Sequence, residues 1–412
     1  MTIETRSVLL VTPRWTRDGG VATHVIASAA ALAARGVDVH VLAARVDPDE
    51  HVAGVAIHHA PLLFKERDVE RRLGEAARSL RVDVVHLHQL DDPDVVAHLQ
   101  RAAPVAISVH GYSGCSSTLH YFRPGEECER AHGPGCIPSL AFRGCAHTRD
   151  PRPLPGSYRR TTRAVRALRQ ADLAISYSST IDRHLAVNGV ERRAIVPLFS
   201  TLEPASAGGH DSRRRVVFAG RVITAKGVGV LVHAARELDA EVVVCGDGWQ
   251  LDAMRRLAAR LGVAERVRFT GWLGPAELAR ELAEASVVAL PSLWPEPFGL
   301  VGIEAHAAGR PVVASATGGV RDWLDDSVSG LLVEPGDAHA LAATLTELLA
   351  DTERQARLGV AGRESVAARF TPERHVAALD DAYRAARRAW EAARSGAARG
   401  TSHAARAEPS RV

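Results

Sequence analysis

The sequence lacks long apolar segments and carries little excess charge. It has no run of about 18 apolar residues that could cross a membrane, and its first residues lack the basic start and apolar core of a signal peptide. The formal net charge of +3 over 412 residues is too small to indicate nucleic-acid binding and leaves room for at most a peripheral contact with a membrane surface. We therefore expect a cytoplasmic protein, and the oligomeric state stays open.

Lysine is scarce as well. Among the 51 lysine and arginine residues, only Lys65 and Lys226 are lysines. A compact, strongly hydrated ammonium group differs from a planar guanidinium in the ligands that it binds. The position of Lys226 between a predicted strand and a predicted helix therefore makes it a candidate for a specific role.

Length and composition favour an α/β protein of two domains. A chain of 412 residues is long for one domain, and its 46% hydrophobic and 24% charged residues are typical of an ordinary soluble α/β enzyme. A strand at 6–12, a helix at 21–35 and a strand at 37–43 form a β-α-β start. The same alternation restarts with a strand at 215–219, after the Ser-, Gly- and Pro-rich residues 199–212, which are predicted to be a linker.

Residues 289–337 contain the strongest functional pattern. A strand at 286–290 leads into a Pro-rich loop with Glu296, and a helix that begins near Gly299 carries Glu304. The unpaired amides and the positive dipole end of such a helix start favour an anion, and the two carboxylates can reach separate hydroxyl groups. The pattern predicts a nucleotide-sugar site, although a turn and an amphipathic helix with two solvated acids would also explain the glutamates.

The run Glu296-Pro-Phe-Gly-Leu-Val-Gly-Ile-Glu304, followed by GRPVVAS and a Gly-Gly pair, resembles the E-x7-E segment of retaining glycosyltransferases of the GT4 family. The resemblance implies the GT-B fold, an α/β architecture of two Rossmann-like domains that face each other across a cleft. It implies that Glu296 binds the donor sugar and that Glu304 binds the nucleotide ribose. It also assigns the diphosphate to residues of the helix start: Phe298, Gly299, Leu300 and Val301.

Basic residues stand at the start of the second α/β unit. Gly220-Arg221 follows the strand at 215–219, and Lys226-Gly227 precedes a helix. This arrangement can clamp an anion, or it can be a surface ion pair. It resembles the G-R…K-G element of GT4 enzymes, which implies that Arg221 and Lys226 neutralise the donor diphosphate. The same resemblance assigns further nucleotide contacts to the loops after the next two strands, with a nucleobase pocket at the second: Asp247, Gly248, Trp272 and Leu273.

Two histidines end neighbouring predicted strands. His88 and His110 both lie at carboxyl ends of strands, where ligands bind in open parallel sheets, although a histidine there can simply pack. The resemblance implies that His110 contacts the donor sugar and leaves His88 as a second candidate. Gly19 and Gly20 form either a tight turn or, by the same resemblance, the Gly-rich loop that faces the donor phosphates and the acceptor.

Four of the five cysteines cluster in a segment of low periodicity at about 112–150, which we interpret as an insertion. They are Cys115, Cys128, Cys136 and Cys145. Clustered cysteines in a cytosolic protein favour a metal over disulfides, but the spacing lacks a C-x2-C pair. We hypothesise a structural zinc ion, with free thiols or two disulfides as alternatives. A similar insertion in some GT4 enzymes supports a structural role near the acceptor cleft.

The predicted organisation assigns acceptor binding to an N-terminal domain, residues 1–198, and nucleotide-sugar binding to a C-terminal domain, residues 213–370. Residues 371–394 are predicted to form a helix that crosses back to the first domain, and residues 395–412 a disordered tail.

We therefore expect a retaining glycosyltransferase that needs no catalytic cofactor. It would move a sugar from a UDP- or GDP-sugar to a hydroxyl of a small-molecule, natural-product, lipid or polysaccharide acceptor. A nucleotide-sugar epimerase on the same fold, which needs no acceptor, and a non-catalytic nucleotide-sugar-binding subunit are the alternatives.

Overall fold

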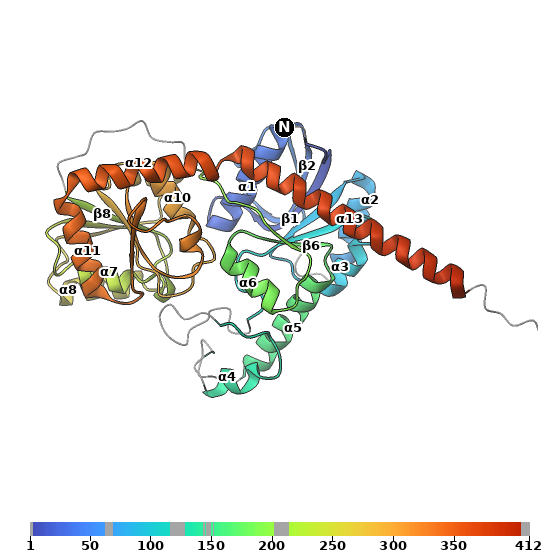
Figure 1. Ribbon diagram of the computed structural model, residues 1–412, viewed down its shortest axis with the longest axis horizontal. Coiled ribbons are helices and arrows are strands. Elements are labelled where there is room, and N and C mark those ends of the chain that lie inside the picture. The colour runs from blue at the N-terminus through green and yellow to red at the C-terminus, as the bar shows by residue number, and fades with distance from the viewer. Residues whose placement is uncertain are drawn as a thin grey trace, which may run out of the picture.

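The chain forms two lobes, each built on a parallel sheet (Figure 1). The structure is a computed structural model and describes residues 3–61, 69–115, 128–142, 145, 150, 152–201 and 214–404, without the side chains of residues 70, 141–142 and 396–404. Residues 116–127, 143–144 and 146–149 of the predicted insertion and residues 202–212 of the predicted linker lie outside the described residues, so both remain predictions.

The first lobe contains a seven-stranded parallel sheet with the strand order β3-β2-β1-β4-β5-β6-β7. Its strands are β1 (Ser7–Trp15), β2 (Asp38–Val46), β3 (Val55–His59), β4 (Val84–His88), β5 (Val105–Ser108), β6 (Leu173–Ser176) and β7 (Arg193–Ile195). Its helices are α1 (Gly20–Ala33), α2 (Val69–Leu80), α3 (Pro93–Leu99), α4 (Cys136–Phe142), α5 (Leu154–Gln170) and α6 (Ser179–Val187).

The second lobe contains a six-stranded parallel sheet with the order β10-β9-β8-β11-β12-β13. Its strands are β8 (Arg215–Ala219), β9 (Glu241–Cys245), β10 (Val267–Gly271), β11 (Val287–Leu290), β12 (Val312–Ser315) and β13 (Gly330–Val333). The remaining helices are η1 (Thr224–Lys226), α7 (Val228–Ala234), α8 (Leu251–Arg260), α9 (Pro275–Ala283), α10 (Leu300–Ala307), η2 (Gly318–Asp322), α11 (Ala338–Ala350), α12 (Thr352–Arg369) and α13 (Pro372–Ala404).

The central strands are apolar on both faces because helices cover both sides of each sheet. Val8 and Leu10 on one face of β1, and Leu9 and Val11 on the other, are at most 1% exposed. Strand β1 is longer than the predicted segment at 6–12, since it continues past Pro13 to pair Trp15 with Val46 of β2. The extension carries the chain further toward the turn that opens α1.

Helices α12 and α13 run in succession along one side of both lobes, so α13 crosses back onto the first lobe (Figure 1). Two buried contacts hold it there. The Asp380 carboxylate accepts hydrogen bonds from the amides of Thr5 (2.9 Å) and Glu4 (3.2 Å), and the Tyr383 hydroxyl lies 2.8 Å from Nδ1 of His86. The C-terminal helix is therefore part of the core of the first lobe.

The predicted end of this helix at residue 394 is too early, because α13 continues to Ala404. Residues 395–404 contain no proline, and adding a residue to an existing helix is much easier than starting a new one. The part of the predicted disordered tail after residue 404 lies outside the described residues.

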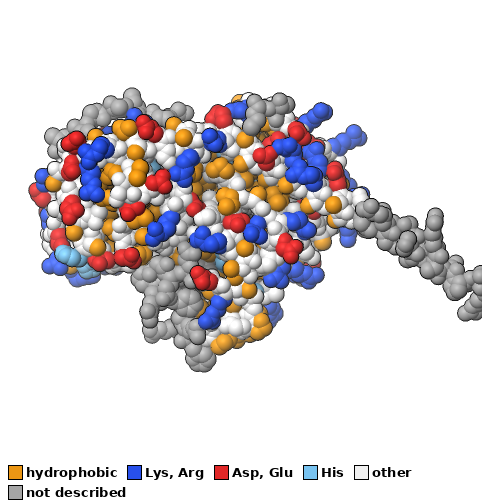
Figure 2. Space-filling view, viewed as in Figure 1, with side chains coloured by type: hydrophobic (Ala, Val, Ile, Leu, Met, Phe, Trp, Pro, Cys, Tyr) orange, Lys and Arg blue, Asp and Glu red, His pale blue; other side chains and the backbone are white. Residues whose placement is uncertain are grey.

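Within the described residues, no helix is both long enough and apolar enough to cross a bilayer. On the face seen in Figure 2, basic and acidic side chains are interspersed. This distribution agrees with the small net charge of the sequence.

Replacing Asp380 by alanine should destabilise the first lobe by about 1–3 kcal/mol, because the buried amide of Thr5 and the part-buried amide of Glu4 lose their acceptor. Urea denaturation monitored by circular dichroism measures the change. The matched control is Asp381→Ala, since the neighbouring Asp381 side chain is 70% exposed and bonds only to Arg384 in the described part of the chain. The control should stay within about 0.5 kcal/mol of wild type, and equal effects of both substitutions would contradict the role of Asp380.

Candidate active site

The strand order of each sheet reverses at one point, and the candidate residues gather in the loops at these points. The reversal lies between β1 and β4 in the first lobe and between β8 and β11 in the second. In open α/β sheets, ligands bind beyond the carboxyl ends of strands at such a switch point. The loops concerned begin at residues 16, 89, 220 and 291.

In the second lobe, Lys226 and Glu296 form an ion pair. The Lys226 ammonium lies 2.7 Å from Oε1 and 2.9 Å from Oε2 of Glu296. The Ser292 hydroxyl donates to the same Oε1, and the ammonium lies 5.8 Å from the ring centre of Trp294. Because the Lys226 and Glu296 side chains are only 22% and 7% exposed, solvent screens their attraction weakly. The structure thus pairs the lysine and the glutamate that the sequence analysis had singled out as candidate site residues.

Glycines allow the two loops to approach this closely. Gly227 has a φ of 67°, and a Cβ on it would lie 1.8 Å from the carbonyl oxygen of Pro291. Gly318 has a φ of 58°, and a Cβ there would lie 2.3 Å from the carbonyl oxygen of Glu296. Only glycine adopts this backbone conformation at low cost and leaves the space free. The Lys226-Gly227 pair and the later Gly-Gly turn therefore have a packing role in shaping the Glu296 loop.

Glu304, the second carboxylate of the E-x7-E segment, has a different environment. It lies within α10, is 6% exposed, and accepts a hydrogen bond of 3.1 Å from the Thr201 hydroxyl. Burial raises the pKa of Glu304 to about 7, and the bond from Thr201 opposes this shift in part. Glu296 is thus held as the partner of a cation, whereas Glu304 is poised between its neutral and charged forms near pH 7.

The start of α10 presents backbone amides at the same switch point. Gly299 has a φ of 93° and precedes the helix, so the first-turn amides of Leu300 and Val301 have no acceptor within the helix. The carbonyl of the buried Phe298 accepts a 2.7 Å hydrogen bond from the Trp323 indole, which fixes the entry to the helix. Together these residues form a positively polarised helix start.

Arg221 lies in the loop between β8 and η1 and is exposed. Within the described residues it forms no ion pair and no hydrogen bond to Lys226 or Glu296. Gly220, with a φ of 146°, precedes it, and the Gly220 amide donates to Cys245 at the end of β9. The structure therefore places Arg221 on the correct loop but leaves its guanidinium in solvent.

The loops after β9 and β10 lie beside this region. The Asp247 carbonyl accepts a 2.8 Å bond from the Val222 amide, and a Cβ on Gly248 would lie 2.4 Å from the Val222 carbonyl oxygen. The turn at 246–248 therefore packs directly on the β8 loop. Leu273 packs against the hydrophobic core, whereas Trp272 is 55% exposed.

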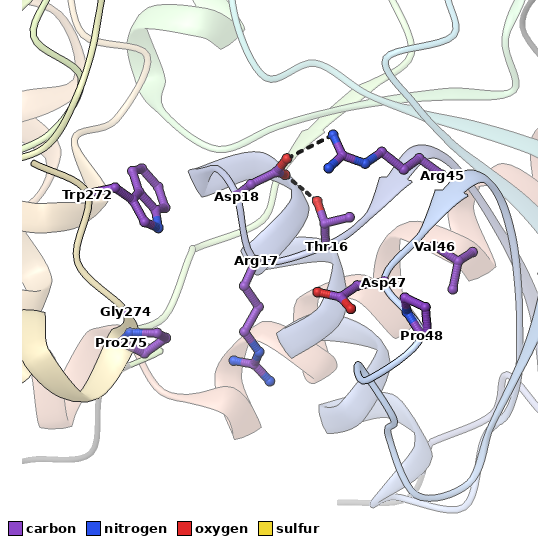
Figure 3. Close-up of a pocket in the computed structure, with 10 residues that line it drawn as sticks. All are labelled: Thr16, Arg17, Asp18, Arg45, Val46, Asp47, Pro48, Trp272, Gly274 and Pro275. Carbon is purple, nitrogen blue, oxygen red and sulfur yellow. Dashed lines mark hydrogen bonds and ion pairs between the residues drawn. The ribbon is translucent and has the colours of Figure 1, made fainter.

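Trp272 lines a cavity of about 540 Å³ between the two lobes (Figure 3). Its indole lies across the cavity from the β1–α1 loop of the first lobe, which contributes Thr16, Arg17 and Asp18. The Arg17 guanidinium is fixed by two hydrogen bonds of 2.5 and 2.8 Å to Glu50. The cavity thus has an aromatic wall from one lobe and a polar wall from the other.

In the first lobe, His88 and His110 meet at the carboxyl ends of β4 and β5. Nδ1 of His88 lies 3.0 Å from Nε2 of His110. Burial lowers the pKa of His110 to about 4 and the pKa of His88 well below its usual value, so both rings are neutral at pH 7. Gly19 and Gly20 lie at the start of α1, which opens from the β1 loop of the same lobe.

Several contacts at the site were not predicted. The Asp322 carboxylate accepts bonds from the amide (2.7 Å) and hydroxyl (2.5 Å) of Ser179 across the two lobes. The Tyr112 and Trp294 rings meet edge-on across the same boundary, 6.2 Å apart. Such partners are far apart in the sequence, and the only signal for Trp294 was its position in the same Pro-rich loop as Glu296.

The four clustered cysteines lie among the described residues and are half-buried. Burial, together with the other three thiols, raises the pKa of Cys145 to about 11. Within the parts of the chain that are described, no group of three or more His, Cys, Asp or Glu side chains is arranged to hold a metal ion. The zinc hypothesis therefore remains a prediction. Cys245, by contrast, is a buried core residue of β9.

Curated relatives match parts of the chain. A D-inositol 3-phosphate glycosyltransferase from Xylanimonas cellulosilytica is 38% identical over 52% of this chain and 54% of its own length. A GDP-mannose-dependent alpha-(1-6)-phosphatidylinositol monomannoside mannosyltransferase from Mycolicibacterium smegmatis is 37% identical over 38% of this chain and 44% of its own length. The chain therefore spans about half the length of these relatives.

Solved structures share the whole fold at lower identity. Sucrose-phosphate synthase from Thermosynechococcus elongatus has a TM-score of 0.70 at 23% identity, over 92% of this chain and 98% of that chain. The Anabaena protein HepE in complex with UDP-glucose has a TM-score of 0.66 at 18% identity, over 91% and 98% of the two chains. These similarities support the predicted two-domain architecture.

Two family descriptions cover most of the sequence in adjacent segments. Residues 18–198 match "Glycosyltransferase Family 4" and residues 202–365 match "Glycosyl transferases group 1". The boundary between the two matches falls between the two parallel sheets. The chain therefore belongs to the GT4 glycosyltransferases and has the GT-B fold.

Proposed function

We propose that the protein transfers a sugar from a nucleoside-diphosphate sugar to an acceptor hydroxyl, with retention at the anomeric carbon. The observation that supports this most strongly is the Lys226–Glu296 ion pair beside the start of α10. It combines a cation for a diphosphate with a carboxylate for sugar hydroxyls at one switch point. Membership of the GT4 family agrees with this chemistry.

Positive charge at the site would stabilise the leaving group. When the bond between the sugar and the diphosphate breaks, negative charge develops on the phosphate oxygens. Lys226, Arg221 and the amides at the start of α10 would stabilise this charge electrostatically. A bound diphosphate would compete with Glu296 for the Lys226 ammonium, and Arg221 is free to turn toward it from solvent.

Glu296 would bind a hydroxyl group of the donor sugar. Its Oε1 already accepts from Ser292, and both carboxylate oxygens contact Lys226. A carboxylate held in this way is a weak nucleophile but keeps lone pairs for a hydroxyl donor. We therefore assign no double-displacement step to Glu296, in contrast to retaining glycosidases.

The nucleoside would bind near Glu304 and Trp272, beyond the part of the site that holds the diphosphate and the sugar. Glu304, whose pKa is about 7, can accept from ribose hydroxyls and, in its protonated form, can also donate to them. Trp272 offers an exposed indole on which a nucleobase can stack, and the cavity that it lines has room for such a ring. Leu273 and the turn at Asp247 and Gly248 would complete this side of the pocket.

The acceptor would approach from the first lobe, near His110 and the Gly19-Gly20 turn. One relative is named for D-inositol 3-phosphate and another for GDP-mannose and a phosphatidylinositol mannoside. We infer that the donor is a UDP- or GDP-sugar. We infer that the acceptor is a hydroxyl-rich molecule, either free or as the headgroup of a lipid.

Replacing Glu296 by glutamine should lower sugar transfer by roughly 100-fold or more, because the charged acceptor for the donor hydroxyl and the partner of Lys226 are both lost. Release of nucleoside diphosphate from a nucleotide sugar measures turnover, and circular dichroism verifies folding. The control is Glu347→Gln on the exposed face of α11, which should behave like wild type. Near-normal turnover of Glu296→Gln would refute the assignment.

A thermal-shift panel of UDP, GDP, ADP and dTDP should reveal one preferred nucleotide. A ligand at 100 times its dissociation constant stabilises the folded state by about 2.7 kcal/mol. Trp272→Ala should reduce the shift for the preferred nucleotide and leave the small shift given by pyrophosphate alone unchanged, since only the base stacks on the indole.

The same panel, followed by product analysis with the matching nucleotide sugar alone, separates the alternative functions. An epimerase would convert the donor without an acceptor. A binding subunit would bind the nucleotide and yield no product with any acceptor. Absence of binding by all four nucleotides would contradict the proposal itself.

Glu304 should make the folded state less stable as the pH rises. Its pKa is about 7 in the folded protein and about 4.3 in an unfolded chain. Between these values the folded state holds the extra proton, so stability is lost as the pH rises from about 4 to 7. Glu304→Gln removes this titration and should gain about 1–3 kcal/mol over this range relative to wild type. Urea titrations at each pH test this, and a pH-independent difference between the two proteins would contradict it.

A further inference from the structure

A group of histidines lies beneath the switch point of the first lobe: His86 and His88 are buried and have no assigned role, whereas His110 is half-buried. His86 and His88 follow one face of β4, with ring centres 4.1 Å apart. His88 is 5.3 Å from the ring of His110, and His110 is stacked on Tyr177 at 5.1 Å and 28°. His88 is 2% exposed, so it reaches the site only through its neighbours.

The hydrogen bond between His88 and His110 couples the two rings. Nδ1 of His88 and Nε2 of His110 are 3.0 Å apart, and burial keeps both rings neutral at pH 7, because their pKa values are lowered. A neutral imidazole has one donor and one acceptor nitrogen. One proton therefore lies between the two rings, and the tautomer of His88 dictates that of His110.

The surroundings of His88 hold it in place. His86, whose ring lies against that of His88 at an angle of 38°, bonds to the Tyr383 hydroxyl of α13 (2.8 Å) and to the Ser108 hydroxyl of β5 (2.7 Å). Ser108 in turn lies 2.5 Å from the Tyr177 hydroxyl. The ring on which His110 stacks and the ring that supports His88 are thus tied to one hydroxyl group.

A neighbouring chain of hydrogen bonds has a fixed proton order. The carbonyl of Pro197 can only accept, so Nδ1 of His375 donates to it at 2.8 Å. Nε2 of His375 must then accept from the Ser28 hydroxyl (2.9 Å), and Nε2 of His24 donates to the same oxygen (3.3 Å). His24 packs edge-on against Tyr177. This part of the core shows that tertiary contacts dictate histidine tautomers in this lobe.

We propose that His88 is a positioning residue for His110: its Nδ1 hydrogen bond to Nε2 of His110 fixes the orientation and tautomer of the ring that faces the donor sugar. The contact of His110 with the sugar rests on the proposed function, whereas the coupling of the two rings does not. His88 touches no substrate, so its effect must pass through His110.

Two substitutions separate the hydrogen bond from the bulk of the ring. His88→Leu fills the site without a polar atom. His88→Asn keeps a polar atom at the position of Nδ1. The matched control is His58→Asn, because His40 and His58 form a similar pair elsewhere, with Nδ1 of His40 and Nε2 of His58 3.2 Å apart and rings at 29°.

The first experiment reads the tautomer directly. Long-range proton–nitrogen NMR spectra of protein labelled with 15N-histidine distinguish donor from acceptor nitrogens of His110, whose signals are identified by their loss in His110→Ala. His88→Leu should change the nitrogen shifts of His110, whereas His88→Asn and His58→Asn should leave them near those of wild type. Unchanged shifts in His88→Leu would overturn the proposal.

The second experiment measures the consequence for the sugar. Calorimetry gives the affinities for GDP and GDP-mannose, and for UDP and UDP-glucose, in each variant. The ratio of the affinity for the nucleotide sugar to the affinity for the nucleotide measures the contribution of the sugar. His88→Leu and His110→Ala should each lower this ratio by roughly 10-fold, because a misplaced group loses most of its contribution. Affinity for the nucleotide alone should stay constant.

A double-mutant cycle decides whether His88 acts through His110. The double variant should lose no more of the sugar contribution to affinity than His110→Ala alone, since the effects of substituting two coupled residues are not additive. The proposal would be overturned if the losses of the two single variants added up in the double variant, or if His88→Leu kept the sugar contribution to affinity of the wild type. If the wild-type protein binds none of the four ligands, the proposed function fails, and the NMR comparison still tests the coupling of the two rings.

Discussion

The ion pair between Lys226 and Glu296 is the interaction on which the candidate site of the second lobe depends. It joins the loop after β8 to the loop after β11. Gly227 leaves room for the backbone of Pro291 where these loops meet, and Gly318 leaves room for the backbone of Glu296 on the other side of the second loop. A charged pair with little solvent exposure is stable only when both partners are present. The pair therefore fixes the shape of the loop that leads into α10, and the amides of that helix start are oriented with it.

The first lobe depends on a different set of interactions. Its interior contains polar side chains, and the C-terminal helix covers them and completes their hydrogen bonds. Tyr383 and His375 of α13 complete the hydrogen bonds of His86 and Ser28, and Asp380 caps the amides that precede β1. Buried polar groups are costly unless they are paired. The same helix that ends the chain thus completes the interior behind His110, and the docking of α13 and the geometry of the site are linked.

The sequence predicted the two α/β units and the strands and helices around both switch points, because these signals are local. A buried parallel strand is a continuous apolar run, and a glycine next to a helix start marks a turn. Local signals did not predict where α13 and β1 end, because the length of a helix or strand also depends on contacts with distant parts of the chain. The helix α13 continues past residue 394, and strand β1 continues past Pro13.

By itself the sequence determined the fold class, the family, and which residues are candidates, since apolar periodicity and the E-x7-E and G-R…K-G patterns are properties of short segments. Only the tertiary structure decided the state of each candidate. It paired Glu296 with a lysine 70 residues away, buried Glu304 beside the Thr201 hydroxyl, and placed His88 in hydrogen-bond contact with His110. The physical reason is that the charge of a carboxyl group and the tautomer of an imidazole depend on burial and on neighbouring groups, and these neighbours come together only when the two sheets and the terminal helix have packed.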